Sequence, residues 1–116
     1  MALSPSTLGF LRAASNANRL MILEWLRDPP RHFPPQVEGD LVEDGVCLGA
    51  IVRKLGVSQP TGTNHMRILS DAGLVTSKKI GTWVFFRLRE DGISSALSDL
   101  SRHLVGATQP TFSNRS

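Results

Sequence analysis

The 116-residue sequence contains a single cysteine and no long apolar run. One thiol, Cys47, excludes an internal disulfide and any metal site built from several thiolates of the same chain. The longest uninterrupted apolar run covers residues 20–23, far short of the roughly 20 residues that span a bilayer. The first ten residues lack the basic start, apolar stretch and cleavage site of a secretory signal. We therefore expect no membrane partner and a cytoplasmic location.

The sequence also lacks a pattern typical of an enzyme. Its three histidines and one cysteine have no spacing that would pair a nucleophile with a base. The length fits one domain of ordinary globular composition, with 41% hydrophobic and 20% charged residues, and leaves no room for a separate catalytic domain. We expect a non-enzymatic protein.

Charge is distributed unevenly along the chain. Five acidic residues and one basic residue lie at positions 28–44, whereas positions 45–89 hold seven basic residues and one acidic residue. A basic segment of this kind is the usual footprint of a surface that binds a polyanion. The alternative is a basic face that is merely solvated.

Apolar residues at helical spacing, together with capping residues, predict five helices. The second helix is expected to be central and largely buried, because its apolar run leaves few polar positions for solvent. It must end near Asp28, since Pro29 and Pro30 lack the N–H group that a continuing helix needs. The predicted helices cover residues 6–14, 19–27, 48–55, 59–72 and 91–104.

Two stretches show no helical period. Residues 29–45 contain four prolines and two glycines, and they predict an irregular, acidic, Pro-rich loop of a length that is uncommon and sometimes functional. Residues 106–116 are polar and predict a flexible tail.

The middle of the chain predicts a winged helix-turn-helix. Only Gly56 and Val57 separate the third helix from Ser58, which is suited to cap the fourth, and two helices joined so tightly are typical of a helix-turn-helix. Residues 74–80 and 83–88 are rich in β-formers, and the glycine between them favours a hairpin, the wing. The expected fold is therefore mainly α with a small β-hairpin, over one domain of residues 1–105.

This order of elements, together with several short motifs, resembles the ArsR/SmtB family of bacterial winged-helix repressors. The resemblance covers about residues 8–104. It implies a homodimer whose first and fifth helices form the interface, and a repressor that an effector, often a metal ion, releases from operator DNA. The motifs are Ser58-Gln59-Pro60, His65-Met66, Ala72-Gly73-Leu74-Val75 and Gly81-Thr82-Trp83-Val84-Phe85-Phe86-Arg87-Leu88.

The fourth helix carries the residues expected to read duplex DNA. On a helical wheel Gly62, Met66 and Leu69 share the inward face, so the opposite, polar face is free to enter the major groove. Its outward residues include Thr63, Asn64 and Arg67. Asn64 suits adenine and Arg67 suits guanine, although Arg67 as a phosphate contact or a solvated residue is an equal alternative.

Other polar residues are expected to hold the DNA backbone. Ser58, Gln59 and Thr61 lie at a helix N-terminus, where free N–H groups favour a phosphate. Lys78 and Lys79 precede the wing turn and Arg87 follows it, so they are candidates for backbone or minor-groove contacts. For Arg87, an ordinary surface strand residue is the alternative.

The effector of such a regulator has two candidate sites. In metal-sensing members one site is a Cys-x-Cys pair on the third helix. Cys47 matches its first position, but Gly49 stands at the second. Cys47 is therefore most simply a small buried residue at a helix start, and thiol sensing is the alternative. Asp99 and His103 share one face of the fifth helix, and across a dimer they would offer a site for zinc, nickel or cobalt. A surface salt bridge is the alternative for this pair. His65 is expected to be a structural, hydrogen-bonded histidine.

Apolar residues of the first and fifth helices define the expected dimer interface. A rival hypothesis is a winged-helix interaction module, or an accessory subunit of a transcription complex, that holds a protein co-regulator through the Pro-rich loop and the fifth helix. The polar, base-flanked face of residues 58–67 favours double-stranded DNA as the partner. The interface residues are Leu8, Leu11, Ile93, Leu97, Leu100 and Leu104.

Overall fold

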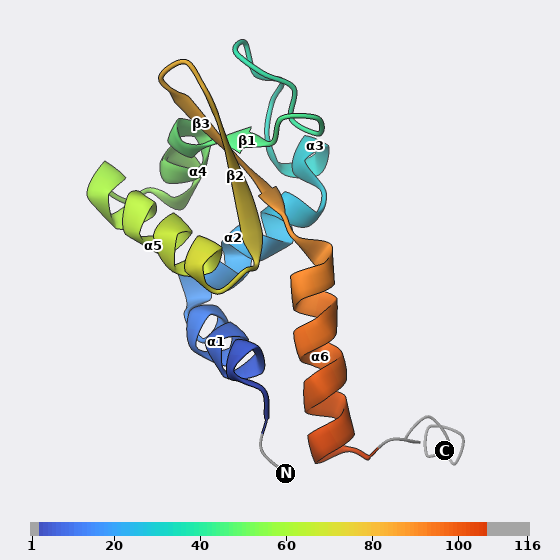
Figure 1. Cartoon of the computed structure of the whole chain (residues 1–116). Helices are drawn as coiled ribbons and strands as arrows, with labels where there is room; N and C mark the ends of the chain where they lie inside the picture. Colours follow the sequence, from blue (N-terminus) through green and yellow to red (C-terminus); the bar gives the residue numbers. More distant parts are fainter. Residues whose placement is uncertain (1–2, 107–116) are drawn as a thin grey trace.

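The computed structural model describes residues 3–106, so the predicted tail from 107 onward lies outside the described residues. Figure 1 shows α1 and α6 side by side below a body formed by the remaining helices and a small sheet. The helices are α1 (Pro5–Ala14), α2 (Ala17–Arg27), α3 (Pro29–His32), α4 (Leu48–Leu55), α5 (Gln59–Asp71) and α6 (Glu90–Leu104). The strands are β1 (Val46–Cys47), β2 (Val75–Ile80) and β3 (Trp83–Leu88).

Side-chain caps begin three of the helices. Each capping oxygen accepts a hydrogen bond from the backbone N–H three residues further on, which satisfies a donor that the first turn leaves free. The predicted cap at Ser58 is confirmed, and the structure adds caps at Ser4 and Asn16, so that α2 begins at Ala17 rather than at residue 19. The three bonds join Ser4 to Thr7 at 3.2 Å, Asn16 to Arg19 at 3.1 Å and Ser58 to Thr61 at 3.3 Å.

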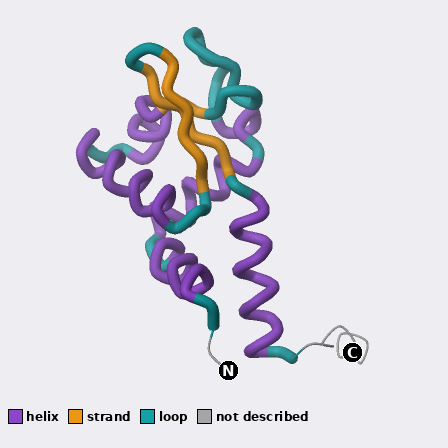
Figure 2. The backbone as a smooth tube through the Cα atoms, in the orientation of Figure 1, coloured by secondary structure: helices purple, strands orange, loops and turns teal. Residues whose placement is uncertain are grey.

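The prediction of an irregular connection over residues 29–45 was incomplete. Pro29 and Pro30 end α2 as expected, but they also open the short helix α3, because proline is tolerated at the first helical positions, whose N–H groups have no partner within the helix. Figure 2 shows the rest of this segment as a long loop that rises beside the wing hairpin.

The sheet contains one strand more than the predicted hairpin. β2 and β3 pair antiparallel around the turn at Gly81, as expected, and β1 pairs with the other edge of β3, with Val46 opposite Phe86. Gly45 makes this approach possible: its φ is +107°, and a Cβ there would lie 2.4 Å from the carbonyl oxygen of Phe86. The loop is thereby joined to the wing.

The core lies where α2, α4 and α5 meet the sheet. Ile22, Ile51, Met66 and Leu69 are fully buried there and pack with Phe86 of β3, whereas the buried Phe85 lies beside Gly39 of the loop. As expected, α2 contributes to the centre of the core, but the expectation that it is largely buried was wrong. Leu20 and Met21 are exposed, because the sheet and the neighbouring helices cover only the face that holds Ile22, Leu23 and Leu26.

A close helix contact joins α4 to α5 at Gly62. A Cβ on this buried glycine would lie 2.5 Å from Cγ2 of Val52, closer than two carbon atoms can stand. The residues expected on the inward face of this helix, Gly62, Met66 and Leu69, are all buried, which confirms the predicted packing.

We predict that Gly62→Ala lowers the free energy of unfolding by about 1–2 kcal/mol, although alanine is the better helix former, because the stiff Val52 side chain cannot move aside. Gly9→Ala is the matched control: Gly9 lies within α1, a Cβ there meets nothing within 4 Å, and the change should add about 0.5–1 kcal/mol. Urea denaturation measures both. Equal gains in the two variants would disprove the close contact.

Candidate nucleic-acid interface

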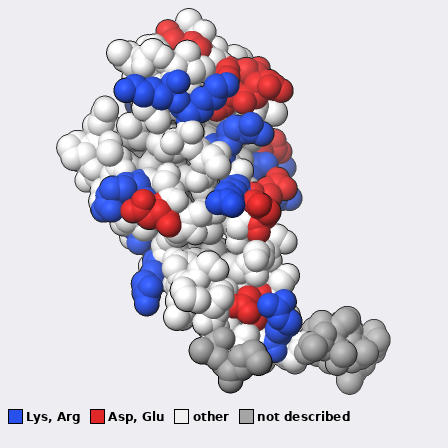
Figure 3. All heavy atoms as spheres, in the orientation of Figure 1, with Lys and Arg blue, Asp and Glu red and all other residues white. Residues whose placement is uncertain are grey.

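The outer face of α5 is polar and open to solvent. Thr63, Asn64 and Arg67 are exposed, as their spacing predicted, while His65 and Met66 between them face inward. In Figure 3 the surface over α5 is uncharged except for one adjoining basic and acidic pair. A short, polar and nearly uncharged face of this kind has the character that major-groove contact requires.

Arg67 is held at both ends of its guanidinium group. Its Nη2 donates to Oδ1 of Asn64 at 2.6 Å, and its Nη1 lies 3.3 Å from Oδ2 of Asp71. The two residues predicted to read bases are therefore bonded to each other in the free protein. All three side chains are exposed, so base edges can replace these bonds at small cost.

His65 anchors the inner face of α5 to the first two helices. Arg19 donates through Nε to the carbonyl oxygen of Ala13 at 2.7 Å, and its Nη1 lies 3.2 Å from Nδ1 of His65. An arginine only donates, so Nδ1 is the acceptor and the proton of the neutral ring lies on Nε2. Burial, and then the charge of Arg19, lower the pKa of His65. The predicted structural, hydrogen-bonded role of this histidine is confirmed.

The N-terminus of α5 points into solvent. Ser58, Gln59 and Thr61 are exposed, and no acidic residue lies in the first turn. Ser58 caps the helix, and its hydroxyl group also donates to Oγ1 of Thr61 at 2.9 Å. The end of the helix thus keeps its positive dipole free of a neighbouring carboxylate, which suits a phosphate.

The three candidate cations of the wing are in different situations. Nζ of Lys78 donates to Oδ1 of Asp44 in the loop at 2.6 Å, and Nη1 of Arg87 reaches the carbonyl oxygen of Glu43 at 3.5 Å. The bond from Lys78, together with one from the backbone of Asp40, lowers the pKa of Asp44. Within residues 3–106, Lys79 forms no ion pair. Figure 3 shows the basic groups of this region directly beside acidic ones.

Asp99 connects α6 to the start of α1. Its Oδ2 accepts from the hydroxyl group of the buried Thr7 at 2.6 Å and from the N–H of Ser4 at 3.2 Å, and its Oδ1 accepts from Arg102 at 3.1 Å. The bonds from Thr7 and Ser4, with that from Thr7 the largest cause, lower the pKa of Asp99. A carboxylate predicted as a metal ligand or a surface ion pair thus also holds two helices together.

His103 lies next to Asp99, as the spacing predicted. Its Nδ1 is 2.9 Å from the backbone oxygen of Asp99 and 3.5 Å from Oδ1, and its buried Nε2 has no partner within residues 3–106. Among these described residues, no three histidine, cysteine or acidic side chains gather at one point. A metal site at Asp99 and His103 remains a hypothesis that would need a second subunit.

An apolar stripe runs along α1 and α6. Leu8, Leu11, Leu97 and Leu104 are exposed and Leu100 is half-buried. Ile93, which was expected on the same stripe, packs partly against the core of its own chain.

No helix within residues 3–106 is long and apolar enough to cross a membrane.

Sequence reasoning missed the contacts between the loop and the wing. Gln36 fastens the loop to β1, because its amide accepts from the N–H of Cys47 at 2.7 Å and donates to the carbonyl oxygen of Gly45 at 2.9 Å. Cys47 is half-buried, and it ends β1 and precedes α4. The one signal that could have indicated a loop–wing contact was the opposite charge of the two segments.

Comparison with known proteins gives two informative relatives. YbzH of Bacillus subtilis strain 168, an uncharacterized helix-turn-helix-type transcriptional regulator, is 39% identical over 82 residues, which cover 71% of this chain and 82% of that protein. The transcriptional repressor SmtB of Mycobacterium tuberculosis is 29% identical over 93 residues, 80% of this chain but only 58% of SmtB. No protein-family model matches the chain. Since the relatives are transcriptional regulators, the expectation of a non-enzymatic protein is confirmed.

Solved structures confirm the winged helix-turn-helix fold. The ArsR family regulator RHA00566 superimposes with a TM-score of 0.66 over all of both chains at 18% identity. The homodimeric winged helix-turn-helix DNA-binding domain of Mb0332 from Mycobacterium bovis has a TM-score of 0.57 at 23% identity, and covers 89% of this chain and 85% of that domain.

We predict that Thr7→Val lowers the stability of the fold, whereas Thr7→Ser, which keeps the hydroxyl group, lowers it less. Because the pKa of Asp99 is lower in the folded than in the unfolded chain, its stabilisation is present above the ordinary value of 3.8 and is lost as pH falls through the folded pKa. The stability gap between wild type and Thr7→Val should therefore narrow when urea denaturation at pH 7 is repeated near pH 2.5. A constant gap would contradict this assignment.

Proposed function

Because this chain belongs to the ArsR/SmtB family of winged helix-turn-helix transcriptional regulators, we propose that it is a repressor that binds a palindromic operator as a homodimer. The observation that carries the proposal is the exposed outer face of α5, where Thr63, Asn64 and Arg67 stand free of the core. The relative SmtB is named a transcriptional repressor, which supports repression rather than activation.

In the proposed complex the N-terminal half of α5 enters the major groove. The amide of Asn64 then pairs with an adenine and the guanidinium of Arg67 with a guanine, each pair worth roughly 1–3 kcal/mol of discrimination. The bond between the two side chains in the free protein keeps them together on one face, and it exchanges for bonds to base edges on binding. Asp71 then remains beside Arg67 and orients its guanidinium group.

Phosphates contact the rim of this face. The side-chain amide and backbone N–H of Gln59, with the hydroxyl groups of Ser58 and Thr61, receive one phosphate at the positive end of α5. Lys79 contacts a second phosphate from the wing. Lys78 and Arg87 also contact the DNA backbone once their hydrogen bonds to Asp44 and Glu43 of the loop break.

The apolar stripe of α1 and α6 is the proposed dimer interface. Leu8, Leu11, Leu97 and Leu104 are large apolar residues that stay exposed to water within residues 3–106 unless a second subunit covers them. The homodimeric state of Mb0332 supports this arrangement. We propose that residues 1–105 act as one domain for both DNA binding and dimerisation.

Two subunits joined there would bring two Asp99–His103 pairs to one interface. Such a set would suit zinc, nickel or cobalt, and the unpartnered Nε2 of His103 supports it as a donor. Both oxygens of Asp99 are already bonded, Oδ2 to Thr7 and Oδ1 to Arg102. A metal bound by Oδ2 would therefore compete with the contact between α1 and α6.

We predict that selection from random duplex DNA yields an inverted repeat whose half-sites lie about one helical turn, roughly 34 Å, apart. Asn64→Ala and Arg67→Ala should relax the base preference at one position per half-site, whereas Lys79→Ala should weaken all duplexes alike. Arg31→Ala, which removes an exposed arginine of α3, is the control and should leave binding unchanged. If Asn64→Ala costs the same on selected and random duplexes, Asn64 does not read a base.

We predict that wild type is a dimer at tens of micromolar in sedimentation and that Leu97→Glu is a monomer, because a buried carboxylate in the interface has no partner. The matched control is Leu20→Glu: Leu20 on α2 is 53% exposed against 52% for Leu97, yet it lies outside the stripe. A monomeric wild type, or dissociation by both substitutions alike, would disprove the proposed interface.

A further inference from the structure

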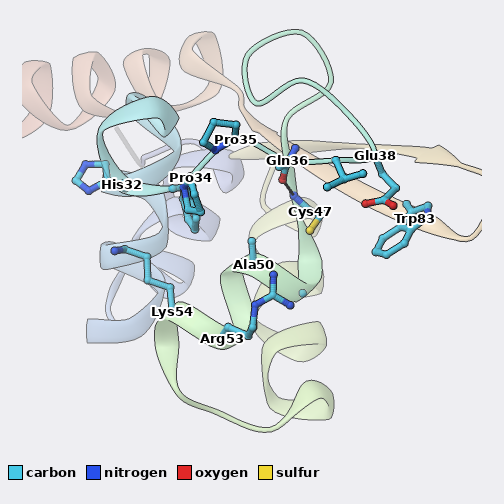
Figure 4. A pocket seen from close by; sticks show the side chains of 13 residues that line it. His32, Pro34, Pro35, Gln36, Glu38, Cys47, Ala50, Arg53, Lys54 and Trp83 are labelled. Carbon is cyan, nitrogen blue, oxygen red and sulfur yellow. Dashed lines mark hydrogen bonds between the residues drawn. The ribbon is translucent and has the colours of Figure 1, made fainter.

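A cavity of about 510 Å³ lies between the Pro-rich loop and α4, and we name it the loop pocket. Its walls come from three parts of the chain: residues 32–38 of the loop, the outer side of α4, and Trp83 at the start of β3. Pockets for small molecules commonly have about 300–1,000 Å³. Figure 4 shows the side chains of these segments arranged around the space.

One wall of the loop pocket is fixed. The amide of Gln36 is fully used, since it accepts from Cys47 and donates to the carbonyl oxygens of Gly39 and Gly45. Pro34 and Pro35 beside it have restricted backbones. The cavity is therefore held open by the structure rather than by a mobile side chain.

The two cations of the pocket differ: Arg53 is available for a ligand, whereas Lys54 lies against two aromatic rings. Within residues 3–106, Arg53 forms no hydrogen bond or ion pair through its side chain, and in Figure 4 its guanidinium group points from α4 into the middle of the pocket. Lys54 lies at one end, with its Nζ 5.0 Å from the centre of the Trp25 ring and 5.7 Å from that of Phe33. Glu38 and Trp83 lie at the opposite end.

We propose that the loop pocket binds a small organic carboxylate with an aromatic body. The forked donors of Arg53 match a carboxylate, and Lys54, at one end of the pocket, adds a second positive charge to the lining. The ring of Trp83, 45% exposed although it is large and apolar, offers a surface on which the body of the ligand stacks, and the two prolines close the other side. The two cations against one carboxylate, Glu38, make the lining repel a metal cation and attract an anion.

The position of the loop pocket connects it to both parts of the DNA-binding surface. Arg53 and Lys54 end α4, and only Gly56 and Val57 separate that helix from the cap of α5. Trp83 pairs with Ile80 at the tip of the wing, and the loop itself is tied to the wing by the ion pair of Asp44 with Lys78. A ligand in the pocket therefore changes operator affinity, a consequence that rests on the proposed function.

The test is calorimetric titration of the full chain, without DNA, with 1-naphthoate as the probe and the uncharged 1-naphthamide as its matched control. We expect saturable binding of one naphthoate per chain and at least about tenfold weaker binding of the amide, since the bond to Arg53 needs the negative charge. Arg53→Gln should weaken naphthoate at least tenfold, and Trp83→Leu should weaken it as well. Arg31→Gln, a loss of charge outside the lining, should leave it unchanged.

Each outcome of this titration decides the proposal. No saturable naphthoate binding up to several millimolar overturns it, and so does binding that Arg53→Gln leaves intact while circular dichroism shows that the variant is folded. Equal binding of the acid and the amide overturns the anion assignment. A separate titration of the selected operator, with and without naphthoate, distinguishes the two claims: failure to bind any duplex refutes the proposed function alone, and unchanged operator affinity refutes only the coupling.

Discussion

The orientation of α5 depends on its close contact with α4. Gly62 carries no side chain, so α5 lies directly against Val52, and the turn of the helix then directs Met66 and Leu69 into the core. The bond between His65 and Arg19 fixes the same helix from the side of α2. Because these contacts use one face of α5 completely, the opposite face is left for the partner, and its residues are those that a DNA groove accepts.

The acidic loop changes the electrostatics of the wing. The sequence contains a basic segment at residues 45–89, but in the fold part of that charge is neutralised locally, since Asp44 binds Lys78 and the backbone of Glu43 approaches Arg87. Phosphate must compete with these contacts. If the wing contacts DNA as proposed, we expect the loop to weaken non-specific attraction to DNA and to make the affinity of the wing sensitive to a ligand that moves the loop.

The local elements of the fold could be predicted from the sequence because their signals are local. Gly56 and Ser58 mark the turn between α4 and α5, and Gly81 marks the tip of the wing, each through backbone preferences of a few neighbouring residues. β1 could not be predicted in this way: two residues, Val46 and Cys47, become a strand only because β3 lies beside them.

The candidate sites also contain some features that local sequence signals predict and others that depend on distant residues. The exposed face of α5 follows from helical spacing, so Asn64 and Arg67 could be placed from the sequence. The bond between Thr7 and Asp99 joins residues 92 positions apart, and the ion pair of Asp44 with Lys78 spans 34 positions. The spacing of apolar residues along a helix or strand does not predict contacts between residues so far apart in the sequence. The loop pocket depends on the same long-range contacts, with walls from the loop, α4 and β3.

The most direct test of the central claim, that the outer face of α5 meets DNA, is to titrate the selected operator into the isotope-labelled protein and follow its backbone amide NMR signals. We expect the largest shifts at residues 58–67 and around the wing turn at Gly81, and small shifts at the inward-facing core of α2. Large shifts confined to the loop and α6, with α5 unchanged, would contradict it and would favour a winged helix that binds its partner through another face.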